Sequence, residues 1–388
     1  MKTNAIQSIK GFKDILPSEI KYYKYIEKII FDISNQYAIN ELRLPFIEKS
    51  ELFMKSIGDN TDIVNKEMYN FIDKNGESIC LRPEGTASVV RSVIEHNLVY
   101  DRGLKKQKYM YYGPMFRHEK PQKGRYRQFN QFGIEYFGFS DTNSDLELII
   151  LGGHVFDKLG LKNIKLHINS LGNKNDKKLY SEIVRNFFTS IKSKLDDYQL
   201  NTLNKNPLRL LDSKKDNIKD ILEQIPAMTE TLSNESKTRF NILLDKLDAI
   251  GIDYILDNSI VRGLDYYNDT VFEWRDMSLG SQNAVCAGGR YDSLVQNTGG
   301  NDVPAIGFAM GIERIVELIK NVDISFDEQQ FIIPIISTLA ETESYLPHCF
   351  HFISIASLIF LSNLPPLCFL VWACILVPCP TTFKAKLL

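Results

Sequence analysis

The sequence predicts an α+β fold in which helices pack on an antiparallel β-sheet. From about residue 80 to 138, short aromatic and β-branched runs are separated by Gly and Pro, a pattern typical of antiparallel strands. A helical segment, "TASVVRSVIEHNL", lies among these runs. Helices that accompany such strands must bury their apolar stripe against the sheet, which favours the α+β class. The 388 residues allow two or three domains with a sizeable core.

Composition is that of an ordinary soluble globular protein. The net charge of -2 means that any contact with nucleic acid must come from local basic patches. The N-terminal segment lacks an apolar core region and a small-residue cleavage site, so we expect a cytoplasmic location and no secretory signal. None of the six cysteines forms a CxxC pair, and no protein-built metal site is expected.

The first half of the chain gives three further elements. Residues 17 to 37 are predicted as a helix, because Pro17 suits its first turn and apolar residues recur at helical spacing. "LRLPFIEKSELF" is predicted as a short strand interrupted by Pro45. Residues 173–250 are rich in Lys, Asp and Asn and poor in Gly. Their helical periodicity predicts a helical insertion within the catalytic domain.

Strands are predicted to resume after the insertion. The segments concerned are "SIVRGLDYYNDTVFEW" and "NAVCAGGRYDSLV". A final helix is predicted with one apolar stripe, formed by Phe308, Ile312, Ile315 and Ile319.

Two polar residues stand in an otherwise apolar strand within "RQFNQFGIEYFG". Residues two or four apart share a strand face, so Gln131 and Glu135 point one way while Phe132, Ile134 and Tyr136 point to the core. Gly133 lies between the two polar residues, where it is predicted to leave room for a ligand. The pattern favours a pocket, and an exposed polar face on a half-buried strand is the alternative.

The loop before this strand, "RHEKPQKGRYR", concentrates five cations: Arg117, Lys120, Lys123, Arg125 and Arg127. Guanidinium groups match phosphate with forked hydrogen-bond donors. The loop is therefore a candidate phosphate site, and a solvated hairpin tip is the alternative.

Three other segments bring polar groups together. "RPEGTASVV" places Glu84 and Thr86 just before a helix, although Thr86 can also act simply as its cap. "VRGLDYYND" joins Arg262 to Tyr266 and Tyr267, and "AGGRYD" contains a Gly pair where backbone can approach a ligand closely. No Walker loop or GxGxxG fingerprint is present, so a P-loop or Rossmann site is not supported.

In this order, the segments resemble those of histidyl-tRNA synthetases, which are class II aminoacyl-tRNA synthetases, over roughly residues 8 to 325. "GFKDILP" is similar to the family's N-terminal signature, and the stretch around "LRLPF" to class II motif 1, which would place Pro45 at a dimer interface. "MFRHEKPQKGRYRQFNQFGIE" resembles motif 2, and "AIGFAMGIERI" resembles motif 3. "RGLDYY" and "AGGRYD" resemble two segments peculiar to the histidine enzymes.

The resemblance implies a role for each matching residue. ATP would be bound by Arg117 at the α-phosphate, Glu119 and Arg314 at the adenine, and Arg125 at the γ-phosphate. Arg262 would contact both the carboxylate and the α-phosphate, which makes Arg117 and Arg262 the catalytic pair. The remaining matches are histidine-binding positions: Glu84, Gly85, Thr86 and Gln131 around the α-amino group, Glu135 and Tyr267 at the imidazole, and Tyr266 beside them.

The fold and activity of the family follow as expectations. The fold would be an antiparallel six-stranded sheet flanked by helices, in a homodimer without membrane contact. The activity would be ATP-dependent activation of L-histidine and its transfer to the acceptor end of tRNA(His), with Mg²⁺ on the outer phosphates. The alternative is a non-catalytic regulatory subunit of ATP phosphoribosyltransferase, which shares the fold.

The expected domains are a catalytic domain at 1–172 and 251–325, the insertion at 173–250, and an aberrant tail at 326–388 in place of an anticodon-binding domain. "QQFIIPIISTLAE" resembles the start of that domain, but the resemblance stops near Glu341. No charged residue occurs from Phe350 to Thr382. We interpret the tail as a reading-frame change or degraded gene end that slows tRNA charging. A membrane anchor is the alternative.

Overall fold

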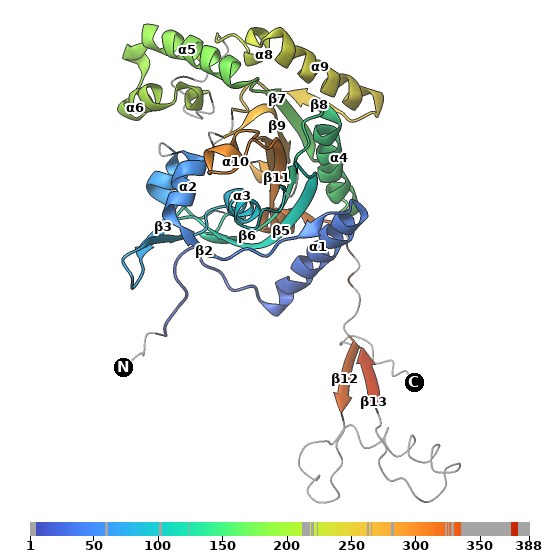
Figure 1. Cartoon of the computed structure of the whole chain (residues 1–388). Coiled ribbons are helices and arrows are strands. Elements are labelled where there is room, and N and C mark those ends of the chain that lie inside the picture. Colours follow the sequence, from blue (N-terminus) through green and yellow to red (C-terminus); the bar gives the residue numbers. More distant parts are fainter. Residues whose placement is uncertain are drawn as a thin grey trace, which may run out of the picture. The chain divides into compact units, whose positions relative to one another are not determined.

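The computed structural model describes most of the chain. The described residues are 5–58, 61–100, 103–122, 124–211, 218, 221–222, 224–261, 264, 266–280, 283–322, 324, 326, 330–334 and 374–378. The chain divides into two compact units, Met1–Ile324 and Ser325–Leu388 (Figure 1).

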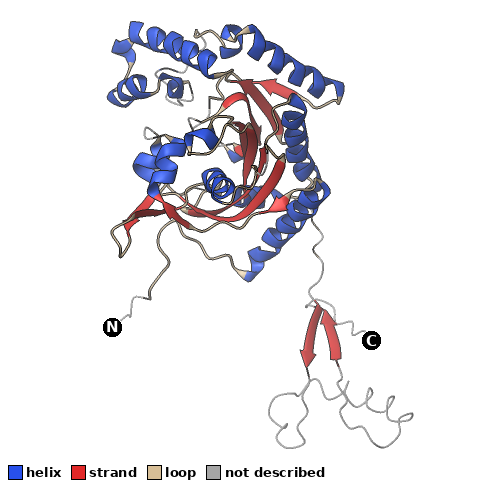
Figure 2. Cartoon of the chain, viewed as in Figure 1, coloured by secondary structure: helices blue, strands red, loops and turns tan. Residues whose placement is uncertain are grey.

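An eight-stranded mixed sheet forms the centre of the first unit, in the order β1-β5-β6-β11-β10-β9-β7-β8 (Figure 2). Its strands are β1 (Asn40–Glu41), β5 (Gln107–Phe116), β6 (Gln128–Phe137), β7 (Lys165–Ser170), β8 (Tyr254–Leu256), β9 (Asn268–Arg275), β10 (Ala284–Arg290) and β11 (Ala305–Gly311). The prediction of an antiparallel six-stranded sheet is wrong for the complete sheet. The central strands from β5 to β7 are antiparallel, but β1 and β8 add parallel strands at the two edges. With two and three residues, β1 and β8 are too short to give a periodic signal.

A second, three-stranded sheet lies near the N-terminal part of the chain, in the order β2-β4-β3. Its strands are β2 (Ile47–Lys49), β3 (Tyr69–Ile72) and β4 (Ser78–Leu81). The single strand predicted for "LRLPFIEKSELF" is wrong in its second half, because Ser50 starts helix α2 (Ser50–Ile57). The buried residues Leu52, Phe53 and Ile57 give that segment a helical apolar face.

Several helices of the first unit begin at start signals in the sequence. The main helices are α1 (Pro17–Gln36), α3 (Thr86–Glu95), α4 (Thr142–Lys158), α5 (Lys174–Ser190), α6 (Asp197–Lys205), α9 (Asn234–Ala249) and α11 (Ile312–Ile319), with the short α8 (Met228–Thr231) and α10 (Leu294–Asn297). Pro17 and Glu19 occupy the first turn of α1, as predicted. Asp141 caps α4 by accepting from two backbone N–H groups. The predicted stripe at 308–319 is corrected at its start, since Phe308 belongs to strand β11 and only the last three residues lie in α11.

Helices cover both faces of the central sheet. On one face, Phe132, Ile134 and Tyr136 of β6 are buried in a core cluster with residues of α1, α4, α9 and α11. Helices α3 and α5 contribute to the cluster on the other face, which includes Phe137 of β6 and Tyr111 of β5. The predicted division of the β6 side chains between two faces is confirmed, and it places Gln131 and Glu135 on the face of α3.

Helices α5, α6, α8 and α9 come from residues 173–250 and lie together at the top of Figure 1. Asp176 joins two of them at their starts. It forms a capping box with Asn173 at α5, and its carboxylate also accepts from Ser233 N at 2.9 Å and Ser236 Oγ at 2.5 Å at α9. The two strand predictions after residue 250 hold in part: β9 begins only at Asn268, and β10 covers the first part of "NAVCAGGRYDSLV".

In the second unit, β12 (Gln330–Pro334) pairs with β13 (Cys374–Pro378) in antiparallel register. Apart from Phe326, the remainder of the predicted aberrant tail lies outside the described residues. Within the part of the chain that the structure describes, no helix is long and apolar enough to span a membrane.

Candidate active site

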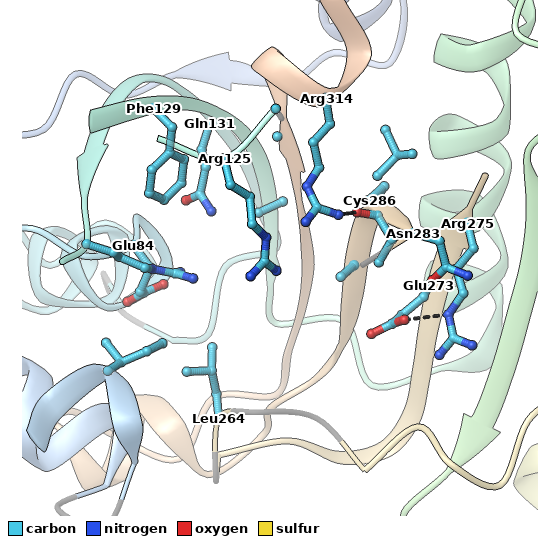
Figure 3. Close-up of a pocket in the computed structure, with 18 of the residues that line it drawn as sticks. Glu84, Arg125, Phe129, Gln131, Leu264, Glu273, Arg275, Asn283, Cys286 and Arg314 are labelled. Carbon is cyan, nitrogen blue, oxygen red and sulfur yellow. Dashed lines mark hydrogen bonds and ion pairs between the residues drawn. The ribbon is translucent and has the colours of Figure 1, made fainter. Parts of the chain in front are cut away.

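A cavity of about 530 Å³ opens on the α3 face of the central sheet. The described residues that line it include most of the predicted site: Glu84, Thr86, Arg117, Glu119, Arg125, Gln131, Tyr266, Tyr267 and Arg314. Figure 3 shows Glu84, Phe129 and Gln131 on one side and Glu273 with Arg275 on the other. The guanidinium groups of Arg125 and Arg314 lie between them. Segments far apart in sequence therefore meet at one site.

The cationic loop between β5 and β6 supplies two arginines to the cavity. Arg117 directly follows β5, and its Nε donates to the carbonyl oxygen of Pro83 at 2.7 Å while its guanidinium lies over the ring of Phe129. Glu119 accepts from Arg125 Nη1 at 2.9 Å and lies 3.7 Å from Arg117 Nη1. These contacts hold both guanidinium groups at the cavity wall. Of the other predicted cations, Arg127 instead donates to the backbone carbonyls of Lys10 and Glu119.

Glu84 and Thr86 stand where α3 begins. The Glu84 carboxylate accepts from the N–H groups of Thr86 and Ala87 at 2.7 and 2.8 Å, so Glu84 caps the helix. Burial raises the pKa of Glu84, and these two backbone donors oppose that rise. The capping role considered for Thr86 is thus filled by Glu84, which frees the Thr86 hydroxyl to donate to Glu135 at 2.6 Å.

Glu135 lies beneath the cavity wall, 1% exposed. It accepts from the hydroxyls of Thr86 and Tyr291, and burial raises its pKa to about 8. Gln131, two residues along the same face, lines the cavity directly. The buried Oε1 atom of Gln131 has no hydrogen-bond partner. An unpaired buried acceptor is costly, so this atom is suited to a donor group of a ligand.

Tyr266 and Tyr267 also line the cavity. Their rings lie 4.6 Å apart, and both pack near Tyr291. Arg262, the second predicted catalytic residue, lies outside the described residues.

Arg314 and Glu313 begin α11 at the end of the cavity. Arg314 donates to the carbonyl oxygen of Ala284, and burial together with the nearby Arg125 lowers its pKa to about 10. Glu313 accepts from both the backbone and side-chain N–H groups of Asn130, and burial raises its pKa to about 7. The crowding of Arg125 and Arg314 favours an anion between them.

Other side chains and backbone atoms of the protein occupy the space beside the glycines that were predicted to face a ligand. A Cβ atom on Gly133 or Gly85 would lie 2.2 Å from the ring of Tyr111, which occupies the space between the two. On Gly288 it would meet Gly307 O at 2.4 Å. The prediction that Gly133 leaves room for a ligand is wrong, because the Tyr111 ring fills that space. Gly85 permits close packing on the same ring, and Gly288 permits close packing against β11.

Sequence reasoning missed several residues of the site. Tyr291 contacts Glu135 across 156 residues, and Asn130 contacts Glu313 across 183. The pairing of Glu273 with Arg275 at 2.7 Å was also missed. The signal available in the sequence was the tyrosine two positions after the Gly pair, in "AGGRYD". The other contacts depend on strand order, which the sequence pattern does not specify.

Comparisons with known proteins agree with this geometry. The family model described as "Histidyl-tRNA synthetase" matches residues 11–315. The chain is 49% identical over 320 residues to "Histidine--tRNA ligase" of Buchnera aphidicola subsp. Schizaphis graminum, covering 82% of this chain and 74% of that protein. It is 47% identical over 323 residues to the Hydrogenovibrio crunogenus protein of the same name, covering 83% and 75%.

Solved structures give the same result. The apo histidyl-tRNA synthetase of S. aureus superposes with a TM-score of 0.68 at 34% identity, covering 83% of this chain and 76% of that one. A Bacillus halodurans protein described as "ATP phosphoribosyltransferase regulatory subunit/histidyl-tRNA synthetase" has a TM-score of 0.59 at 23% identity, with 83% and 85% covered, and shares the fold. From its family-model match and its relatives, this chain belongs to the histidyl-tRNA synthetase family.

Proposed function

We propose that this protein activates L-histidine with ATP and transfers the histidyl group to tRNA(His). In the first step a carboxylate oxygen of histidine attacks the α-phosphorus and pyrophosphate leaves. In the second, a hydroxyl of the terminal ribose of tRNA attacks the acyl carbon and AMP leaves. The regulatory-subunit alternative is not favoured, because the relatives at 47–49% identity are named as ligases.

The convergence of Arg117, Arg125 and Arg314 on one cavity carries this proposal. Two anions must approach each other in the first step, so fixed cations are the main catalytic device available. Arg117 would contact the α-phosphate, together with Arg262, which would also contact the histidine carboxylate. Arg125 would reach the γ-phosphate, while Glu119 and Arg314 would bind the adenine.

The other wall of the cavity would bind histidine. Gln131, with its unpaired Oε1, would accept from the α-amino group beside Glu84, Gly85 and Thr86. Glu135 and Tyr267 would hydrogen-bond the imidazole, with Tyr266 packed alongside. A site built on such hydrogen bonds rejects apolar analogues strongly, since they leave its buried polar groups unpaired.

Mg²⁺ would enter with the outer phosphates of ATP. Among the described residues, no group of three or more His, Cys, Asp or Glu side chains could hold a metal ion. Mg²⁺ is commonly held by substrate phosphates and water with few protein ligands, which fits this site.

Three features beyond the site belong to the same proposal. The domains would be the catalytic part at 1–172 and 251–325, the insertion at 173–250 and a distinct tail at 326–388. The protein would be a cytoplasmic homodimer. Phe46 and Ile47, 52% and 48% exposed beside Pro45, offer apolar surface for the partner subunit. Sedimentation of the purified chain at twice the monomer mass is the expected result.

Exchange of labelled pyrophosphate into ATP tests the first step. Exchange should require histidine and should fall by about 10²–10³-fold in Arg117→Ala, the range for losing one transition-state donor. Lys158→Ala, which removes an exposed cation at the end of α4 that does not line the cavity, is the control. Exchange without histidine, or equal effects of the two substitutions, would contradict the proposal.

A further inference from the structure

Lys177 reaches from the insertion to the histidine wall of the cavity. It lies in the first turn of α5, and its Nζ donates to the carbonyl oxygen of Tyr267 at 3.1 Å. A positive charge gains nothing from the positive N-terminal end of a helix. The carbonyl oxygen of Tyr267 stabilises this half-buried ammonium group through a charge-assisted hydrogen bond.

The base from which Lys177 extends is fixed. Its neighbour Asp176 closes the capping box of α5 and is bonded to Ser233 and Ser236 of α9. Gly172 takes a φ of 58°, and a Cβ there would lie 2.6 Å from Asp176. Only glycine adopts this close, left-handed junction without strain.

The backbone after Tyr267 is attached to the same base. Asp269 takes a φ of 44°, its N–H donates to Gly172 O, and its carbonyl accepts from Leu171 N, both at 2.8 Å. Asn268 in turn exchanges hydrogen bonds with Asp292: its Nδ2 donates to Asp292 Oδ2 and its Oδ1 accepts from Asp292 N. The insertion base and the Tyr291–Asp292 segment thus hold Tyr267 from two sides.

We propose that Lys177 is a positioning residue for histidine recognition, through which the insertion orients the Tyr267 backbone and hence its phenol. This inference rests on the proposed function and extends it to a residue outside the cavity. The arginines that would bind ATP are held by other contacts: Arg117 by Pro83, and Arg314 by Ala284. Losing the Lys177 contact should therefore weaken histidine binding and leave ATP binding unchanged.

Pyrophosphate exchange with the full chain separates these effects. Lys177→Met keeps the apolar stem but removes the donor, and it should raise the KM for histidine roughly tenfold or more, the range for a hydrogen bond to a charged group. The KM for ATP should stay within about twofold, since a factor of two is only about 0.4 kcal/mol. Lys177→Arg should restore most of the histidine affinity. Lys178→Met is the control, because Lys178 is the next residue and its side chain is exposed. Its KM for histidine should equal that of the unaltered chain.

Calorimetry on the same variants measures the dissociation constant of histidine directly, and this constant does not depend on catalytic turnover. An unchanged histidine KM in Lys177→Met, or a parallel rise in the KM for both substrates, would overturn the positioning role while leaving the proposed function intact. If the unaltered chain neither exchanges pyrophosphate nor binds histidine, the proposed function fails and this inference fails with it.

Discussion

Glu135 shows how one buried carboxyl group organises the site. It is surrounded by the central sheet, with Gly307 directly opposite it on β11 and no room there for a Cβ atom. Hydroxyl donors from Thr86 and Tyr291 compensate part of its desolvation. Its raised pKa means that the Glu135 carboxyl group of the ligand-free protein is protonated near neutral pH. A bound ligand that donates a hydrogen bond to this carboxyl group can take the place of that proton.

The raised pKa of Glu135 predicts a pH-dependent stability. The folded pKa is about 8 against an unfolded value of 4.5, so only the folded chain keeps the proton between these values. The free energy of unfolding should therefore fall as pH rises through this window. Glu135→Gln carries no such proton and should show a shallower fall, measured by urea unfolding at several pH values from about 5 to about 8.

Glu95→Gln is the control, because Glu95 is exposed and its pKa is lowered by Arg91. Glu313, whose pKa is about 7, contributes a fall of the same sign in every variant. Equal slopes for Glu135→Gln and the unaltered chain would show that Glu135 is not protonated in this range.

Strands β5 and β6 and helix α3 form one packed element behind the cavity. Tyr111 of β5 stands opposite Gly133 of β6 in the ladder, and its ring lies between Gly133 and Gly85 at the start of α3. The ring thereby sets the distance between the sheet and the helix that carries Glu84 and Thr86. Packing, as much as hydrogen bonding, therefore positions the cavity wall that we propose binds histidine.

A methyl group at Gly133 should disturb this element. Gly133→Ala would bring Cβ to 2.2 Å from the Tyr111 ring, and overpacking of a core costs about 1–3 kcal/mol. Gly311→Ala, in the next strand of the sheet, meets its nearest atom at 3.6 Å and is the control for stability. Chemical denaturation should show the loss for Gly133→Ala alone; equal stabilities would mean that the Tyr111 ring moves aside freely.

At the scale of the whole molecule, the site is assembled within the first compact unit. Its described residues run from Ile63 to Arg314, and all precede the boundary at Ile324. The strand order of the sheet places β6, β11 and β10 side by side, although residues 138–283 separate β6 from β10 in the sequence. Long-range strand pairing is thus what brings Gln131, Arg314 and Tyr291 into one region.

Removal of residues 325–388 should leave adenylation in place. Because every described residue that lines the cavity belongs to Met1–Ile324, the shortened chain should keep the histidine KM of the full chain within about twofold in pyrophosphate exchange. The full chain, purified in parallel, is the reference. Loss of exchange from a shortened chain that still unfolds cooperatively would show that the second unit supports the site.

Sequence periodicity predicted the faces of β6 because Phe132, Ile134 and Tyr136 recur at every second position between polar or small residues. It missed the edge strands β1 and β8, whose pairing depends on neighbours distant in sequence. Gly133 shows a different limit. The sequence indicates that a side chain is absent there, but only the fold shows that Tyr111 fills the space. Glu84 lines the cavity, but its hydrogen bonds to the first N–H groups of α3 could be seen only in the folded geometry.

A crystal structure with a non-hydrolysable analogue of histidyl-adenylate tests the central claim most directly. We predict that the imidazole lies within hydrogen-bonding distance of Glu135 and Tyr267. The phosphate-mimicking group should contact Arg117, and the adenine should pack against Arg314. An analogue bound in this cavity with its imidazole turned away from Glu135, or bound elsewhere on the protein, would contradict this prediction.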